Sequence, residues 1–111
     1  MSSVVVKSIA RNEVTRRVRQ LAADIRRTHP GVLDIYWFGS WINGRPTPGS
    51  DVDLCIVVKD SDKTPRARAG DFLPIGFPTG IDLVVYTGEE FARLANERPE
   101  WYACITSGRR L

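Results

Sequence analysis

The sequence predicts an α+β (α/β) protein in which one small β-sheet is flanked by helices. Apolar residues recur at helical spacing near the N-terminus, three apolar runs of strand length follow between turn residues, and helical spacing returns near the C-terminus. The chain has 111 residues, of which 42% are hydrophobic, as is usual for a globular protein. We therefore expect a single domain over residues 1–111, without a second substrate-binding domain.

Charge and cysteine content narrow the class of protein. The net charge of +3 suits phosphate-bearing partners, but it does not separate nucleic acid from nucleotide. Cys55 and Cys104 lack the CxxC spacing of metal or redox sites, which favours buried thiols in a reducing compartment over a disulfide. Val4–Val6 is too short for a signal-peptide core, and no run approaches the ~20 apolar residues of a membrane span. We expect a soluble, cytoplasmic protein without a membrane partner.

The first predicted helix has Asn12 as its N-cap and ends at His29-Pro30-Gly31. Its apolar stripe is formed by Val14, Val18, Leu21 and Ile25, with arginines between them. A solvated basic face is favoured over a surface that contacts RNA or a partner. His29, the only histidine, is expected to be a capping or surface residue rather than a catalytic base.

A predicted strand over residues 32–38 ends at Gly39, and Ser40 follows. Residues 39–46 match the phosphate loop GxxxxGK[ST] only superficially, because Arg45 and Pro46 replace its lysine and hydroxyl residue. A Gly-Ser pair at a strand end can still hold a phosphate through backbone N–H groups and the hydroxyl.

Asp51 and Asp53 begin the next predicted strand, which extends to Val58. Side chains alternate along a strand, so both carboxylates project on one face, where they can share a hard cation such as Mg²⁺. Cys55 and Ile56 stand where an EF-hand needs an oxygen ligand and glycine, and so short a chain has little room for a glycosidase cleft. A solvated strand end remains the alternative for this pair.

Residues 59–80 are predicted to form a long loop, with or without one helical turn, in which Asp60-Ser61-Asp62 marks a turn. Its basic residues Lys63, Arg66 and Arg68 are assigned to surface charge, with contacts to a triphosphate as the alternative.

Asp82 stands at the start of the third predicted strand, residues 80–86. If this strand lies beside the strand of Asp53, the three acids share one face, where like charges raise their pKa values unless a metal binds. Thr87 or Gly88 then begins a helix, and Pro99 begins a second short helix whose aromatic residues are assigned to the core.

Three separated elements of the chain together resemble a known family. They are Phe38-Gly39-Ser40, then Asp51-Val52-Asp53-Leu54 after a gap of 11 positions from Ser40 to Asp51, and Ile81-Asp82-Leu83. This order resembles the DNA polymerase β-like nucleotidyltransferase superfamily, and the short chain resembles its minimal nucleotidyltransferase (MNT) branch. The resemblance covers roughly residues 12–108. It implies a small mixed β-sheet with flanking helices, the polymerase β-like palm.

The resemblance also implies a catalytic site. Gly39 and Ser40 would hold the nucleotide phosphates, and Asp51 and Asp53 would bind two Mg²⁺ ions about 3.5–4 Å apart. Asp82 would complete the site as a metal ligand or as a general base for the acceptor hydroxyl.

The chain departs from the MNT pattern just after the Gly-Ser turn. Many MNT sequences have a small residue and then an arginine there, whereas this chain has Ile42 and Asn43. Arg45, two positions further on, is the expected substitute for contact with the nucleotide phosphates.

The implied activity is Mg²⁺-dependent transfer of AMP from ATP to a hydroxyl group, with release of pyrophosphate. MNT proteins often pair with a helical HEPN ribonuclease toxin and act as antitoxins by adenylylating its tyrosine, so a HEPN-family partner is expected. Nucleic acid is not favoured as a partner but stays open. The alternatives are a non-catalytic module that neutralises a partner by binding, and a small-molecule nucleotidyltransferase of the aminoglycoside-modifying type. No residue specifies the acceptor, the base or the oligomeric state.

Overall fold

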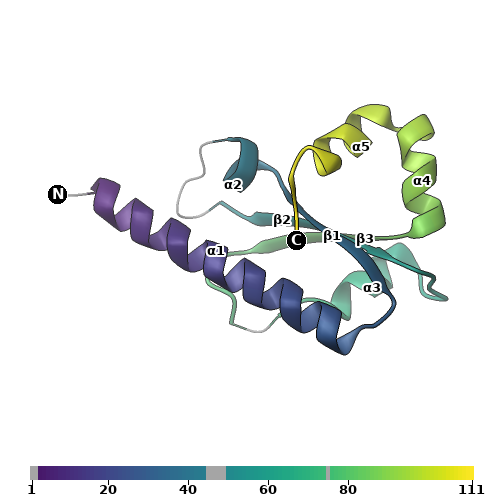
Figure 1. The fold of residues 1–111 in the computed structure, drawn as a ribbon, viewed down its shortest axis with the longest axis horizontal. Helices are drawn as coiled ribbons and strands as arrows, with labels where there is room; N and C mark the ends of the chain where they lie inside the picture. The colour runs from purple at the N-terminus through teal and green to yellow at the C-terminus, as the bar shows by residue number, and fades with distance from the viewer. Residues whose placement is uncertain (1–2, 45–49, 75) are drawn as a thin grey trace.

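Helices cover both faces of a four-stranded sheet in the computed structural model, which describes residues 3–44, 50–74 and 76–111 (Figure 1). In chain order the elements are α1 (Ser3–Thr28), β1 (Val32–Phe38), α2 (Ser40–Asn43), β2 (Val52–Val58), α3 (Pro65–Gly70), β3 (Ile81–Thr87), α4 (Gly88–Glu97), α5 (Pro99–Thr106) and β4 (Arg109–Arg110). The three central strands therefore lie where the apolar runs predict them.

The strand order of the sheet is β3-β2-β1-β4. β1 is antiparallel to both β2 and β4, whereas β2 and β3 are parallel. Parallel neighbours need a long crossover connection, and residues 59–80 with α3 provide it. The mixed sheet with flanking helices confirms the predicted α+β class.

The side chains of β2 alternate between two hydrophobic cores, one on each face of the sheet. Val52, Leu54, Ile56 and Val58 pack in the core that includes the apolar stripe of α1. Cys55 and Val57 pack in the other core, with Phe91 of α4 and Ile105 of α5. Figure 1 shows α1 and α3 on one side of the sheet and α4 and α5 on the other. Asp53 is in phase with Cys55, so it lies on the α4–α5 face.

The predicted start of α1 at Asn12 is wrong. The helix begins at Ser3, because residues 3–11 contain no Gly or Pro that would end it, and Asn12 lies inside the helix. The predicted apolar stripe is confirmed, with Val14, Val18 and Ile25 buried and Leu21 partly buried.

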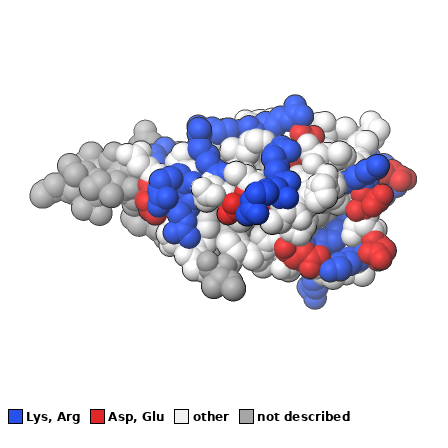
Figure 2. All heavy atoms as spheres, turned by 60° about the horizontal axis from the view of Figure 1, so that its bottom comes forward, with Lys and Arg blue, Asp and Glu red and all other residues white. Residues whose placement is uncertain are grey.

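The outer face of α1 is basic and solvated, as predicted. Arg16 and Arg27 are exposed and pair with acidic residues one turn earlier on the helix. Figure 2 shows Lys and Arg side chains over this side of the molecule with Asp and Glu side chains among them. The surface charge on this side of the molecule is therefore mixed rather than uniformly positive.

The helix α3 begins where Thr64 accepts a hydrogen bond from the backbone N–H of Ala67 at 3.3 Å and Pro65 occupies the first turn. Arg68 of this helix is buried, so its assignment to surface charge is wrong. The reason is a long-range partner: Arg68 Nη1 lies 2.6 Å from Oε1 of Glu90 at the start of α4.

The C-terminal helices begin as predicted. Thr87 and Glu90 form a capping box at the start of α4, and Pro99 lies in the first turn of α5. Trp101 and Tyr102 pack against the core, as expected for the aromatic residues there. The short strand β4 was not predicted, because its two arginines show no alternation.

The cysteines are free and only one of them is buried. Burial raises the pKa of the Cys55 thiol to about 12. Cys104 is exposed on α5, so the expectation that both thiols are buried is wrong for this residue. Within the described ranges, no helix has the length and apolarity that a membrane span needs.

Candidate active site

The sheet brings two of the three predicted acids directly side by side. Asp53 of β2 is in register with Asp82 of β3, and on its other side it is in register with Phe38 at the end of β1. Paired residues on neighbouring strands project to the same face, so Asp53 and Asp82 share the α4–α5 face. The turn formed by Gly39 and Ser40 begins one residue beyond Phe38, so it adjoins this pair of acids.

Asp51 lies just outside β2, and its backbone is held from both sides. The indole N–H of Trp41 donates to the carbonyl of Ser50 at 2.9 Å, which ties α2 to the residue before Asp51. The N–H of Val52 donates to the carbonyl of Gly80 at 2.9 Å, which ties the residue after Asp51 to the start of β3. These bonds fix the backbone at Asp51 relative to the strands that carry Asp53 and Asp82.

Two glycines make room for two of the carboxylates. Gly39 has a φ of 86°, which favours glycine, and a Cβ atom at this position would overlap the carboxylate of Asp53. A Cβ atom at Gly80 would likewise overlap the carboxylate of Asp51. The sequence pointed to Gly39 only as a phosphate-binding residue. Gly80 was missed, although a glycine beside a strand that starts with an acid is a signal of close approach.

The negative charges of Asp51 and Asp82 act on Asp53. The pKa of Asp53 is raised, first by burial of its carboxyl group and then by the negative charges of Asp82 and Asp51. Asp51 and Asp82 are exposed, whereas Asp53 is half-buried between them. A group of carboxylate oxygens that repel one another suits a hard divalent cation.

The fit of this site to a divalent cation rests on the chemistry of its donors, which are the carboxylate oxygens of the three acids. Among the described residues, no group of three or more His, Cys, Asp or Glu side chains is positioned to hold a metal ion as the structure stands.

The turn after β1 leads into the short helix α2. The carbonyl of Gly39 accepts hydrogen bonds from the N–H groups of Ile42 and Asn43, at 3.1 and 2.9 Å. Ser40 is exposed as the first residue of this helix, where backbone N–H groups have no acceptor within the helix. Arg45, the expected substitute for the MNT arginine, lies outside the described residues.

The fold and the acids together define a nucleotidyltransferase-type palm. The family model described as "Nucleotidyltransferase domain" matches residues 18–103, which include Gly39, Ser40 and the three acids. The chain belongs to the nucleotidyltransferase domain family, whose members transfer a nucleoside monophosphate and generally use a nucleoside triphosphate and a divalent metal. The searches of curated proteins and of solved structures found no match.

The raised pKa of Asp53 predicts how the stability of the metal-free protein depends on pH. Its carboxyl group ionises at a higher pH in the folded chain than in the unfolded chain, so the folded state is penalised as the pH rises through this range. The melting temperature of Asp53→Asn relative to wild type is expected to increase from about pH 3 to about pH 7. Thermal denaturation in the presence of a chelator measures this difference. The same series on Asp62→Asn, an exposed residue, is the control. A difference that stays constant or reverses for Asp53→Asn contradicts the raised pKa assigned to burial of Asp53 and to its acidic neighbours.

Proposed function

We propose that this chain is a Mg²⁺-dependent nucleotidyltransferase of the MNT type that transfers AMP from ATP to a hydroxyl group. The observation that carries the proposal is the register of Asp53 with Asp82, beside the turn of Gly39 and Ser40. It joins, at one end of the sheet, the three sequence elements on which the resemblance rests.

In this proposal each residue has a defined role. The backbone N–H groups at Gly39 and Ser40, with the serine hydroxyl, hold phosphate oxygens of ATP. Asp51 and Asp53 hold two Mg²⁺ ions, and Asp82 is a further ligand or accepts the proton of the acceptor hydroxyl. When bound, the ions neutralise the negative charge that develops on the phosphate oxygens.

The reaction forms one bond and breaks one bond. The acceptor oxygen attacks the α-phosphorus of ATP, and the bond from this phosphorus to the bridging oxygen of the β-phosphate breaks. AMP is thereby attached to the acceptor and pyrophosphate leaves. The proton of the hydroxyl goes to Asp82 or to water, and no oxidation or reduction takes place.

The proposed acceptor is a tyrosine of a HEPN-type toxin, which the adenylylation would neutralise. The resemblance to the MNT branch supports this acceptor, and no residue of the described chain specifies it. Arg45 is proposed to contact the phosphates in place of the arginine found in MNT sequences.

Nucleotide binding tests the enzymatic function before the acceptor is known. With Mg²⁺ present, ATP at about 100 times its Kd is expected to stabilise wild type by about 2.7 kcal/mol. The measurement is the melting temperature with ATP alone, Mg²⁺ alone and both together. Absence of stabilisation with both favours the non-catalytic module instead.

Replacing Gly80 by alanine is expected to reduce nucleotidyl transfer about a hundredfold. The new Cβ atom displaces the carboxylate of Asp51, and a displacement of about 1 Å in a catalytic site costs a factor of this size. Initial rates of transfer measure the loss. Gly31→Ala is the matched control, because a Cβ atom there meets nothing within 4 Å. Equal rates for the two variants contradict the role of Gly80.

A further inference from the structure

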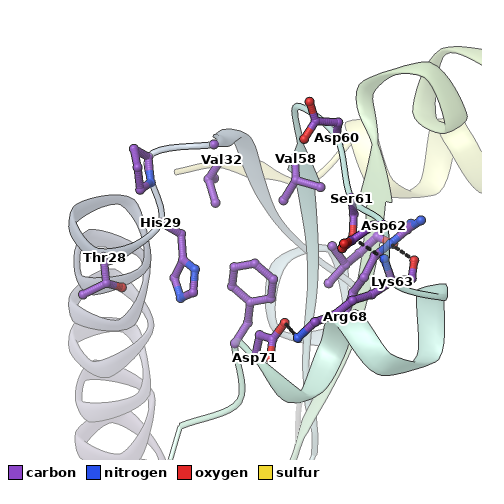
Figure 3. Close-up of a pocket in the computed structure, with 14 residues that line it drawn as sticks. Thr28, His29, Val32, Val58, Asp60, Ser61, Asp62, Lys63, Arg68 and Asp71 are labelled. Carbon is purple, nitrogen blue, oxygen red and sulfur yellow. Dashed lines mark hydrogen bonds and ion pairs between the residues drawn. The ribbon is translucent and has the colours of Figure 1, made fainter.

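A pocket of about 600 Å³ lies at the end of the sheet opposite the three acids. Its lining comes from the end of α1, the start of β1, the end of β2, the loop after β2, α3 with the two residues after it, and β3. Figure 3 shows Thr28 and His29 on one side of this pocket, and the loop residues Asp60, Ser61 and Lys63 on the other. None of the three acids of the candidate active site lines it. A molecule bound here would therefore not occupy the site of nucleotidyl transfer.

The floor and one wall of the pocket are apolar. Val32, Val58 and Val85 come from three different strands and are at most 9% exposed, so they form a firm floor. On one wall the ring of His29 packs against Phe72, with ring centroids 4.6 Å apart. Such a surface accommodates the apolar body of a small molecule.

The basic groups of the pocket already have acidic partners. Lys63 Nζ lies 2.7 Å from Asp71, and the buried guanidinium of Arg68 pairs with Glu90. By contrast, no hydrogen bond or ion pair reaches the carboxylates of Asp60 and Asp62 from any described residue. Both are exposed in the loop that borders the pocket. The charge left without a partner is therefore negative.

We propose that this pocket binds a small organic cation, an ammonium or guanidinium group carried on an apolar or aromatic body. The body lies on the valine floor beside the rings of His29 and Phe72, and the cation faces Asp60 and Asp62. An anion is disfavoured because it would have to displace Asp71 or Glu90 from its partner. This site is independent of the proposed function, since it uses none of its residues.

Three matched probes test the proposal on the full chain: phenethylammonium, 2-phenylethanol and phenylacetate, which are cationic, neutral and anionic. NMR titrations of the ¹⁵N-labelled protein follow the backbone amides. Phenethylammonium is expected to shift the amides of His29, Gly31, Val32 and residues 58–63 saturably, and to bind at least about tenfold more tightly than either other probe. The double variant Asp60→Asn/Asp62→Asn is expected to lose about tenfold in affinity for the cation alone. Because both residues are exposed, the variant is expected to fold as wild type does.

Glu97→Gln, at an exposed position at the end of α4, is the matched control and should bind like wild type. Three results would overturn the proposal: equal binding of the three probes, shifts confined to other residues, or no saturable shift up to about 10 mM cation. An unchanged affinity in the double variant would do so as well. A normal amide spectrum of that variant shows that a loss of binding does not come from unfolding.

Discussion

Replacing Asp53 by asparagine is expected to reduce nucleotidyl transfer by about a thousandfold, the size of effect seen when one group that stabilises a transition state is removed. Asparagine has the shape of aspartate, so it fits against Gly39, but it lacks the negative charge that a divalent cation requires. Initial rates with ATP and Mg²⁺ measure the loss. Mg²⁺ is also expected to raise the melting temperature of wild type but not that of the variant.

The metal-free stability of the same variant provides a second readout. At neutral pH, Asp53→Asn is expected to melt at a higher temperature than wild type, because it removes a half-buried charge that Asp82 and Asp51 repel. Loss of activity together with gained stability is characteristic of a functional residue rather than a structural one. A variant that is less stable than wild type and keeps its activity contradicts the assignment. Asp62→Asn, which is exposed in the loop after β2 at the opposite end of the sheet, should change neither quantity.

Replacing Glu90 by alanine is expected to lower the free energy of unfolding by about 3–5 kcal/mol. The substitution leaves the guanidinium of Arg68 without its acidic partner. Because the side chain of Arg68 is only 7% exposed, the charge left without this partner is buried. It also removes the side-chain acceptor for the N–H of Thr87, which completes the capping box of α4. Denaturation with urea measures the loss. The neighbouring pair of Glu89 and Arg93 is the control.

The side chain of Glu89 is 83% exposed in its ion pair with Arg93, so Glu89→Ala is expected to cost at most about 0.5 kcal/mol.

Lowering the pH should reduce the difference in the free energy of unfolding between wild type and Glu90→Ala. The pKa of Glu90 is lowered, above all by its hydrogen bond to Arg68, so the stability it contributes is present above its unfolded pKa and is lost as the pH falls through its folded pKa. Equal losses for the two variants, or a gap that widens in acid, contradict the role given to the buried pair.

The strands could be predicted closely because each is an apolar run between turn residues. The run from Val32 to Phe38 is β1 itself, since Gly31 and Gly39 bound it on both sides. The start of α1 could not be predicted in this way, because Asn12 has a capping side chain but lies in a sequence that continues the helix. A residue with good capping chemistry marks a boundary only where the preceding residues disfavour the helix.

What the sequence could not supply were contacts between distant segments. Arg68 resembles any surface arginine until α3 packs on the sheet and Glu90 comes within 2.6 Å of it. Gly80 resembles a loop glycine until β3 lies beside β2 and the carboxylate of Asp51 takes the space that a Cβ atom at Gly80 would need. Likewise, the residues of β4 become a strand only by pairing with Tyr36 and Trp37 of β1. The position of Asp82 beside Asp53 could be predicted, because the pattern of an acid at a strand start occurs twice.

The most direct test of the catalytic centre follows the label of ATP into an acceptor. Wild type, Mg²⁺ and the proposed partner protein are incubated with ATP labelled at either the α- or the γ-phosphorus, in parallel with Asp53→Asn. Nucleotidyl transfer predicts label in the acceptor from α-labelled ATP only, loss of that label with a chelator, and none above background with the variant. Label from γ-labelled ATP, or equal labelling by wild type and Asp53→Asn, would contradict a nucleotidyl-transfer centre built on these carboxylates.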